Sequence, residues 1–337
     1  MLTSNLITRL PSAGTILRRR ALAYFALVLA VFIWGINFIV VQNGINAWGD
    51  RKFTFLAARF WIACIAYAAV LMLRGSSARA FTLSRKSIFH AALVGLVLAC
   101  GYGFQTWYLA DHSVVNTAFL TSTTVLWAPL LAALFRVRVD VTTIVGAVVA
   151  LGGIALIQLQ GFQLWPLNVN HWFAILAAVF FAIEILLVSR FAPADKAIQW
   201  TAVSCLTVAV VMTGFAFVHD TWSWPTDQAA ARVFAVVFTG IFATAVALGL
   251  QNWAQAQKVE GAPIIDGPRA AIISTLEPVF TFAFALLLIL LGLTKPEELA
   301  KPYPAIGCFL ILIGTLVSEL AAARRTQKPV KAEGALS

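Results

Sequence analysis

The 337-residue sequence has few charged side chains and few residues suited to binding a metal ion. Only 11% of its residues are Asp, Glu, Lys or Arg, whereas 61% are hydrophobic. A soluble globular domain carries about 25% charged residues, so this chain could not cover a surface that faces water. Its four cysteines and four histidines are scattered through the sequence. We therefore expect no disulfide framework, no metal site and no cofactor.

The motifs of an enzyme or of an ATP-driven pump are also missing. The sequence contains no recognisable nucleophile–base pair and no phosphate-binding loop. No stretch between the apolar segments is long enough for a sensor domain. We therefore expect no catalytic residues, and neither an enzyme nor a receptor. Any transport should take its energy from gradients across the membrane.

What the sequence does contain is a series of long apolar segments. The first, 21–41, follows a basic tail and is too long for the core of a signal peptide. The others lie at 53–73, 88–110, 114–135, 141–159, 171–191, 198–218, 233–256, 270–292 and 303–323. Because lipid cannot satisfy exposed backbone groups, each segment predicts a helix. The expected fold class is an all-α polytopic membrane protein with ten transmembrane helices.

The distribution of basic residues predicts the orientation in the membrane. If the N-terminus is cytoplasmic, eighteen of the 24 Lys and Arg residues fall in cytoplasmic segments and five in segments on the opposite side. This bias favours both termini inside the cytoplasm of a bacterium, with the chain in the inner membrane. The net charge of +10 then reflects topology and not a nucleic-acid partner.

Several landmarks occur twice, in the same order. The sequence GFQTW at 103–107 returns as GLQNW at 249–253, an offset of 146 residues, and Asn37 corresponds to Glu184 at 147. Pro129 corresponds to Pro278 at 149. Such duplication is typical of transporters, and an odd number of helices per half inverts the second half. We expect a cytoplasmic tail (1–20), a first five-helix repeat (21–160), a second, inverted repeat (161–323) and a cytoplasmic C-terminal tail (324–337).

These residues carry a family resemblance that covers nearly the whole chain. The sequence WGINF at 34–38, Arg59, the repeated prolines and the glycines of the fifth and tenth segments resemble the EamA-type branch of the drug/metabolite transporter superfamily. The sequence at 103–107 and the overall length look most like the bacterial aromatic amino-acid exporters of that superfamily. The resemblance implies ten helices, an inverted repeat and export of small metabolites.

Helical geometry separates the residues of the repeated sequence. Gln105 and Trp107 are two residues and therefore about 200° apart, so they point to opposite sides of one helix. We interpret the glycine and tryptophan faces as packing surfaces and the polar face as a pathway. The expected substrate-binding residues are Trp34, Asn37, Phe38, Tyr102, Gln105, Thr121, Trp127, Phe181, Glu184, Gln251, Gln255 and Ser274.

A few residues inside the apolar segments are candidates for coupling or gating. Charges within a span are costly and are functional candidates by default. The candidates are Arg59, Glu184, Glu277, Pro129 and Pro278. Structural alternatives stay open: Glu184 could pair with Arg59, Arg59 could reach the membrane surface, and hydroxyls could bond their own helix. The prolines predict kinked helices.

The expected lining is aromatic and neutral, with no basic cluster to bind phosphates. We therefore predict a secondary transporter that exports aromatic and other hydrophobic amino acids by alternating access around a central cavity. The alternative is a proton-coupled multidrug exporter of organic cations that uses Glu184 and an aromatic cage. The expected partners are a small-molecule substrate and the lipid bilayer, with the chain as a monomer.

Overall fold

The computed structural model describes residues 13–49, 51–73, 83–111, 114–136, 139–158, 170–221, 229–292 and 303–326. Helices account for almost all of them. The helices are α1 (Ala13–Trp48), α2 (Lys52–Leu73), α3 (Arg85–Asp111), α4 (Val114–Ser122), α5 (Thr124–Leu134), α6 (Val141–Gln158), α7 (His171–Phe191), the 3-10 helix η2 (Ala194–Lys196), α8 (Ala197–His219), α9 (Ala229–Phe238), the π-helix η3 (Thr239–Val246), α10 (Ala247–Ala256), α11 (Gly267–Ser274), α12 (Glu277–Leu290) and α13 (Tyr303–Thr326). A short hairpin pairs β1 (Lys258–Val259) with β2 (Ala262–Pro263).

The predicted polytopic α-helical class is confirmed. Within the described residues, nine helical stretches are long and apolar enough to cross a membrane, and Val141–Ile157 is a shorter apolar helix. These stretches coincide with the ten apolar segments of the sequence. The largest differences are at the ends: α1 begins at Ala13 and continues to Trp48, well beyond the apolar segment at both ends. Hydropathy identifies the part of a helix that lies in lipid. A helix can extend beyond this part into the membrane interface as long as its backbone hydrogen bonds continue.

Two of the predicted spans are interrupted. The fourth divides at Thr123 into α4 and α5, and the ninth divides at Thr275 and Leu276 into α11 and α12. Pro278 lies in the first turn of α12, where its missing N–H has no helical partner to lose. Pro129 lies inside α5, six residues after the break. Each of the two spans with a repeated proline is therefore interrupted, but the break lies several residues before Pro129 and just before Pro278.

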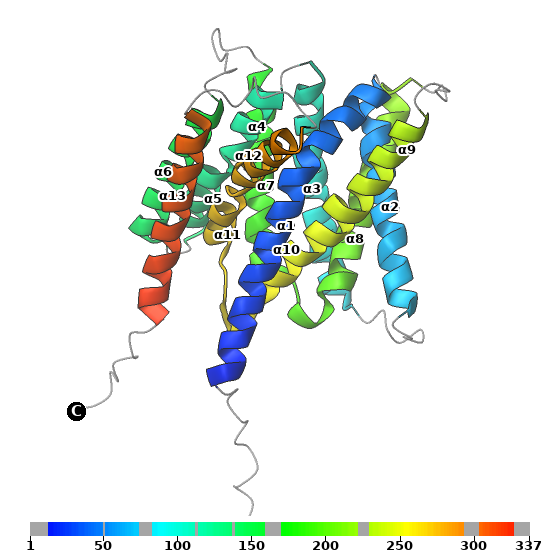
Figure 1. Ribbon diagram of the computed structural model, residues 1–337. Coiled ribbons are helices and arrows are strands. Elements are labelled where there is room, and N and C mark those ends of the chain that lie inside the picture. The colour runs from blue at the N-terminus through cyan, green and yellow to red at the C-terminus, as the bar shows by residue number, and fades with distance from the viewer. Residues whose placement is uncertain are drawn as a thin grey trace, which may run out of the picture.

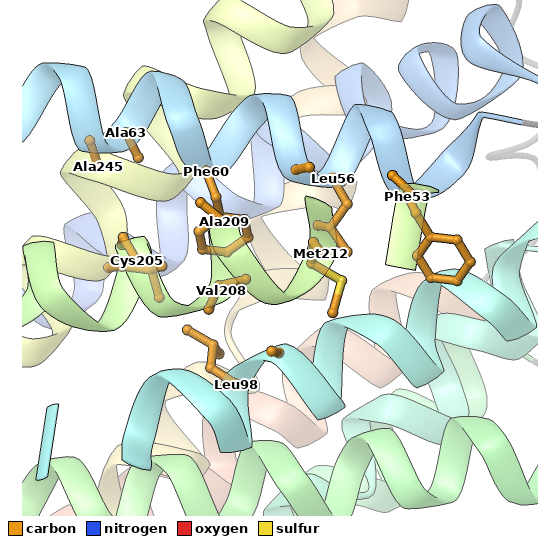
Figure 2. Close-up of a cluster of buried hydrophobic side chains, with 14 of the residues drawn as sticks. Phe53, Leu56, Phe60, Ala63, Leu98, Cys205, Val208, Ala209, Met212 and Ala245 are labelled. Atoms are coloured by element: carbon orange, nitrogen blue, oxygen red, sulfur yellow. The ribbon is translucent and has the colours of Figure 1, made fainter. Parts of the chain in front are cut away.

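The apolar core lies where α2 and α3 pack against α8 and η3. Figure 2 shows Phe53, Leu56 and Phe60 of α2 facing Val208 and Met212 of α8, with α3 beneath them. A second apolar cluster joins α1, α7, α10 and α11. These two clusters form most of the apolar core. The buried polar side chains that are described below belong to the same helices.

Helices α6 and α13 form a separate pair at one side of the bundle (Figure 1). They cross through backbone contacts between glycines. A Cβ atom added to Gly153 would collide with the carbonyl oxygen of Gly307, and one added to Gly146 would collide with that of Gly314. Small residues let helices approach closely in lipid. The glycines of the fifth and tenth spans therefore have the packing role that the sequence suggested.

Candidate substrate and coupling site

Trp34 of α1 connects the two apolar clusters. Its ring packs against both of them, and its indole Nε1 donates a hydrogen bond to the carbonyl oxygen of Ala243, 2.8 Å away in η3. Tyr67 donates in the same way to the carbonyl oxygen of Ala245 at 2.6 Å. A π-helical turn departs from the regular α-helical hydrogen bonding, and such turns often mark functional sites. The side chains of α1 and α2 thus engage the irregular part of the eighth span.

The ring of Tyr102 is the centre of an aromatic group at the same level. It meets the ring of Phe60 edge-on at 5.4 Å and the ring of Phe181 edge-on at 5.3 Å. The guanidinium carbon of Arg59 lies 5.3 Å from its ring centre. Two predicted lining residues, Tyr102 and Phe181, are therefore in direct contact although they belong to different halves of the chain.

Arg59 is buried inside the bundle, with 5% of its surface exposed. Its Nε donates to the hydroxyl of Thr244 at 3.0 Å. Within the described residues no carboxylate oxygen lies within 4.0 Å of its guanidinium, whereas Arg269 forms an ion pair with Glu319. The side chain therefore neither reaches the membrane surface nor pairs with Glu184.

Glu184 of α7 is also buried, with 3% of its surface exposed. Gln251 of α10 donates through Nε2 to Oε2 of Glu184 at 3.3 Å. The other oxygen, Oε1, has no hydrogen-bond partner among the described residues. Four residues further along α10, Gln255 accepts from Ser189 of α7 at 2.9 Å. The polar face of α10 thus lies against α7, and a buried carboxylate retains an unused acceptor.

Other predicted residues are placed less decisively. Asn37 is buried and its Oδ1 has no partner among the described residues. Gln105 is half-buried and makes no hydrogen bond to another described residue. Trp127 packs against the cluster that contains α11. The side chain of Phe38 lies outside the described residues.

The hydroxyls of the fourth and ninth spans bond their own helices. Thr121 donates to the carbonyl oxygen of Thr117 at 2.8 Å, and Ser274 donates to that of Ala270 at 3.0 Å. This is the local alternative that short polar side chains often adopt in a span. Neither hydroxyl is therefore evidence for a binding site by itself.

Glu277 begins α12, directly after the break in the ninth span. Its side chain is half-buried and interacts electrostatically with Tyr102. Tyr102 therefore interacts electrostatically with two acids, Glu184 and Glu277, and with Arg59. No group of three or more His, Cys, Asp and Glu side chains that could hold a metal ion occurs in the part of the chain that the structure describes.

Sequence reasoning missed the π-helix and two residues that it positions. Thr244 receives the hydrogen bond from Arg59 and donates to the carbonyl oxygen of Thr239, five residues earlier. Gly240 lets α2 approach, because an added Cβ would lie 2.8 Å from the carbonyl oxygen of Arg59. Phe60 escaped notice because it is one of many apolar residues in α2. No sequence pattern signals a single inserted residue in a helical turn.

Comparisons with known proteins agree with this architecture. An uncharacterized transporter of Archaeoglobus fulgidus is 26% identical over 303 residues, which are 90% of this chain and 87% of that protein. The uncharacterized inner membrane transporter YedA of Escherichia coli is 30% identical over 166 residues, 48% of this chain and 50% of that protein. A solved crystal structure matches with a TM-score of 0.68 at 21% identity, covering 91% of this chain and 99% of that one, which shows a shared fold.

The helical fold and these relatives define the chain as a multi-pass membrane transporter and not an enzyme. Residues 21–159 match the profile of the EamA-like transporter family. This part of the chain is therefore similar to that family, which lies within the drug/metabolite transporter superfamily.

Proposed function

We propose that the chain exports aromatic and other hydrophobic amino acids across the bacterial inner membrane. The observation that carries this proposal is the contact between the Tyr102 and Phe181 rings beside one buried cation, Arg59, and one buried acid, Glu184. Rings can hold an apolar side chain, while a few placed polar groups fix the orientation of a small ligand. A zwitterion with a hydrophobic side chain matches this combination.

The mechanism we propose is alternating access between two inverted repeats, 21–160 and 161–323, driven by a gradient. The packing supports it, because contacts between spans recur when the halves are exchanged. Helix α3 packs against α7 and α8. In the second half, α10 packs against α1, and the adjoining π-helix η3 packs against α2. The crossed glycine contacts of α6 and α13 exchange in the same way.

For the topology we propose that both termini are cytoplasmic. The first turns of α1 and the last turns of α13 lie at the same end of the bundle (Figure 1), as an even number of spans requires. The excess of Lys and Arg on that side supports a cytoplasmic location. We also propose that the monomer is the transporting unit, since the proposed site is formed within one chain.

A second candidate is a proton-coupled exporter of organic cations. The specific observation that favours it is the unpartnered Oε1 of Glu184, one helical turn from Phe181. A carboxylate beside aromatic faces attracts a ligand cation. In this version Glu184 would alternate between binding the drug and binding a proton.

Flux measurements in proteoliposomes distinguish the two candidates. Purified full-length protein is tested with labelled phenylalanine, leucine and an aromatic quaternary ammonium compound, with and without a pH gradient. Saturable flux of the amino acids that exceeds flux of the quaternary ammonium supports the amino-acid exporter. Flux of the quaternary ammonium alone, driven by the pH gradient, contradicts it and supports the second candidate.

The variant Glu184→Gln sharpens this test. It keeps the hydrogen-bonding shape of the side chain but removes its charge, so flux of an organic cation should fall about tenfold or more. Phenylalanine flux should fall only a few-fold, because the zwitterion keeps its interaction with the rings and with Arg59. Complete loss of phenylalanine flux in a folded variant would instead indicate an obligatory proton site.

A further inference from the structure

The geometry points to Arg59 as the residue that binds the carboxylate of the transported molecule, so that molecules with a carboxylate are preferred over the corresponding amines. This inference rests on the proposed function, because it names the substrate group that one side chain of the proposed site recognises. It also gives Arg59 a substrate contact in place of the coupling or gating role expected from the sequence.

The depth of Arg59 is the first reason. It lies in the second turn of α2, and 5% of its surface is exposed. The next residue, Phe60, lies in the apolar layer between α2 and α8 (Figure 2). A guanidinium keeps its charge in proteins, and a charge held inside a transmembrane bundle is costly unless it has polar partners or a function.

The partners of Arg59 are the second reason, because its contacts among the described residues are with neutral groups. Its Nε bonds the Thr244 hydroxyl, and its guanidinium carbon lies 5.3 Å and 5.6 Å from the ring centres of Tyr102 and Phe60. By contrast, Arg269 forms an ion pair with Glu319, which Tyr24 also contacts. Among the described residues, Arg59 thus has no protein carboxylate, whereas Arg269 has one.

The position of Glu184 is the third reason. Tyr102 interacts electrostatically with both Arg59 and Glu184. Cys205 also interacts electrostatically with both of these charged residues. The cation on α2 and the acid on α7 therefore both lie near Tyr102 and Cys205 without forming an ion pair with each other. An amino acid carries an ammonium and a carboxylate on one carbon atom, and the planar guanidinium fork is suited to binding a carboxylate with two hydrogen bonds.

A purely structural role is the competing explanation. Thr244 donates to the carbonyl oxygen of Thr239 at 3.0 Å, so its oxygen is an acceptor for Arg59 in the π-helix. That role needs only the Nε of the guanidinium. It predicts that loss of Arg59 disturbs η3 and lowers the transport of every substrate alike, whereas carboxylate binding predicts a loss that depends on the substrate.

The test compares three compounds that share a phenyl group. Phenylalanine carries both charges, 3-phenylpropionate carries only the carboxylate and phenethylamine carries only the ammonium. In proteoliposomes with the full chain, Arg59→Gln should reduce flux of the two carboxylates about tenfold or more relative to wild type, as expected for loss of a charge-assisted hydrogen bond. Flux of phenethylamine should change less than about twofold.

Ligand-dependent melting provides a second measurement that does not depend on transport. Phenylalanine should raise the melting temperature of the purified wild-type protein in detergent, and this increase should disappear in Arg59→Gln. The variant Arg59→Lys keeps the charge but loses the fork, so it should retain part of the preference for carboxylates. Thr244→Val removes the contact of Arg59 with η3 and the hydrogen bond of Thr244 to Thr239 but keeps the guanidinium, so it should lower all three fluxes by a similar factor.

The matched control is Arg232→Gln. Arg232 is also buried, but it bonds the carbonyl oxygen of Ala47 near the end of α1, so the variant should leave substrate preference unchanged. If folded Arg59→Gln loses all three fluxes equally, Arg59 is structural and the inference is overturned while the proposed function stands. If the wild type carries phenethylamine but no phenylalanine, the proposed function itself fails.

Discussion

The two copies of the repeated sequence have nearly the same residues but different surroundings. The first, 103–107, lies in α3, a continuous α-helix from Arg85 to Asp111. The second, 249–253, lies in α10, which directly follows the π-helix η3. In α10 Gln251 is buried against Glu184, whereas Gln105 in α3 is half-buried with no hydrogen bond to a described residue. Two similar stretches of sequence thus have different contacts in the structure.

The tryptophans of the two copies differ as well. Trp253 packs against the apolar cluster of α1, α7 and α11. Trp107 is 38% exposed and lies among Phe53, His219 and Lys52. The tryptophan of the second copy is therefore packed against a core cluster, whereas that of the first is more exposed. The predictions below test whether this difference matters for stability and for transport.

The largest expected effect concerns the two tryptophans. Trp253→Ala should lower the free energy of unfolding by about 3 kcal/mol, because it removes a large ring that packs against the cluster of α1, α7 and α11. Trp107→Ala should cost about 1 kcal/mol, the scale of a few aromatic contacts at a partly exposed position. Thermal unfolding of both variants in the same detergent measures the difference. Equal losses would mean that the two copies are packed alike.

The glutamines should differ in transport rather than in stability. Gln251→Ala removes the hydrogen bond to Glu184 and leaves a buried carboxylate without a hydrogen-bond partner among the described residues, so substrate flux should fall about tenfold. Gln105→Ala should reduce flux about twofold or less. Fluxes are compared at equal membrane expression, with Leu250→Ala as the neighbour control. A similar loss in Gln251→Ala and Leu250→Ala would contradict the assignment of the polar face of α10.

The smallest effect is expected at the glycines. A Cβ at Gly249 would lie 3.0 Å from the Tyr67 hydroxyl, which bonds the carbonyl oxygen of Ala245. At Gly103 the nearest atom would be Met212 Cε at 3.6 Å, an ordinary contact. Gly249→Ala should therefore lower the melting temperature by a few degrees, roughly 1 kcal/mol of strain, and Gly103→Ala should leave it unchanged or raise it slightly. A lower melting temperature for Gly103→Ala than for Gly249→Ala would reverse the comparison.

The spans could be predicted because each depends on local composition alone. A helix such as α7, with bounds His171–Phe191, follows directly from an apolar segment that must satisfy its own backbone hydrogen bonds. The contact of Tyr102 with Phe181 could not be deduced in this way, although both residues were proposed for the pathway. It depends on how α3 packs against α7, and hydropathy contains no information on that packing.

The breaks and the π-helix were also beyond sequence reasoning. Pro129 and Pro278 suggested kinks, but the fourth and ninth spans divide at Thr123 and at Thr275. A proline removes one backbone hydrogen bond, but the position of the helix break depends on packing against the neighbouring helices. The turn at Thr239–Val246 is held by the side chains of Trp34, Arg59 and Tyr67, which come from distant segments.

The amino-acid sequence by itself determined that the chain is a polytopic membrane protein and where its helices lie. These properties follow from apolar length and backbone hydrogen bonding, both of which are local. Only the tertiary structure decided that Arg59 is buried beside Tyr102 without a carboxylate partner among the described residues, and that Gln251 rather than Gln105 holds an acid. Those pairings depend on helix rotation and close packing, since a buried charge is defined by what surrounds it.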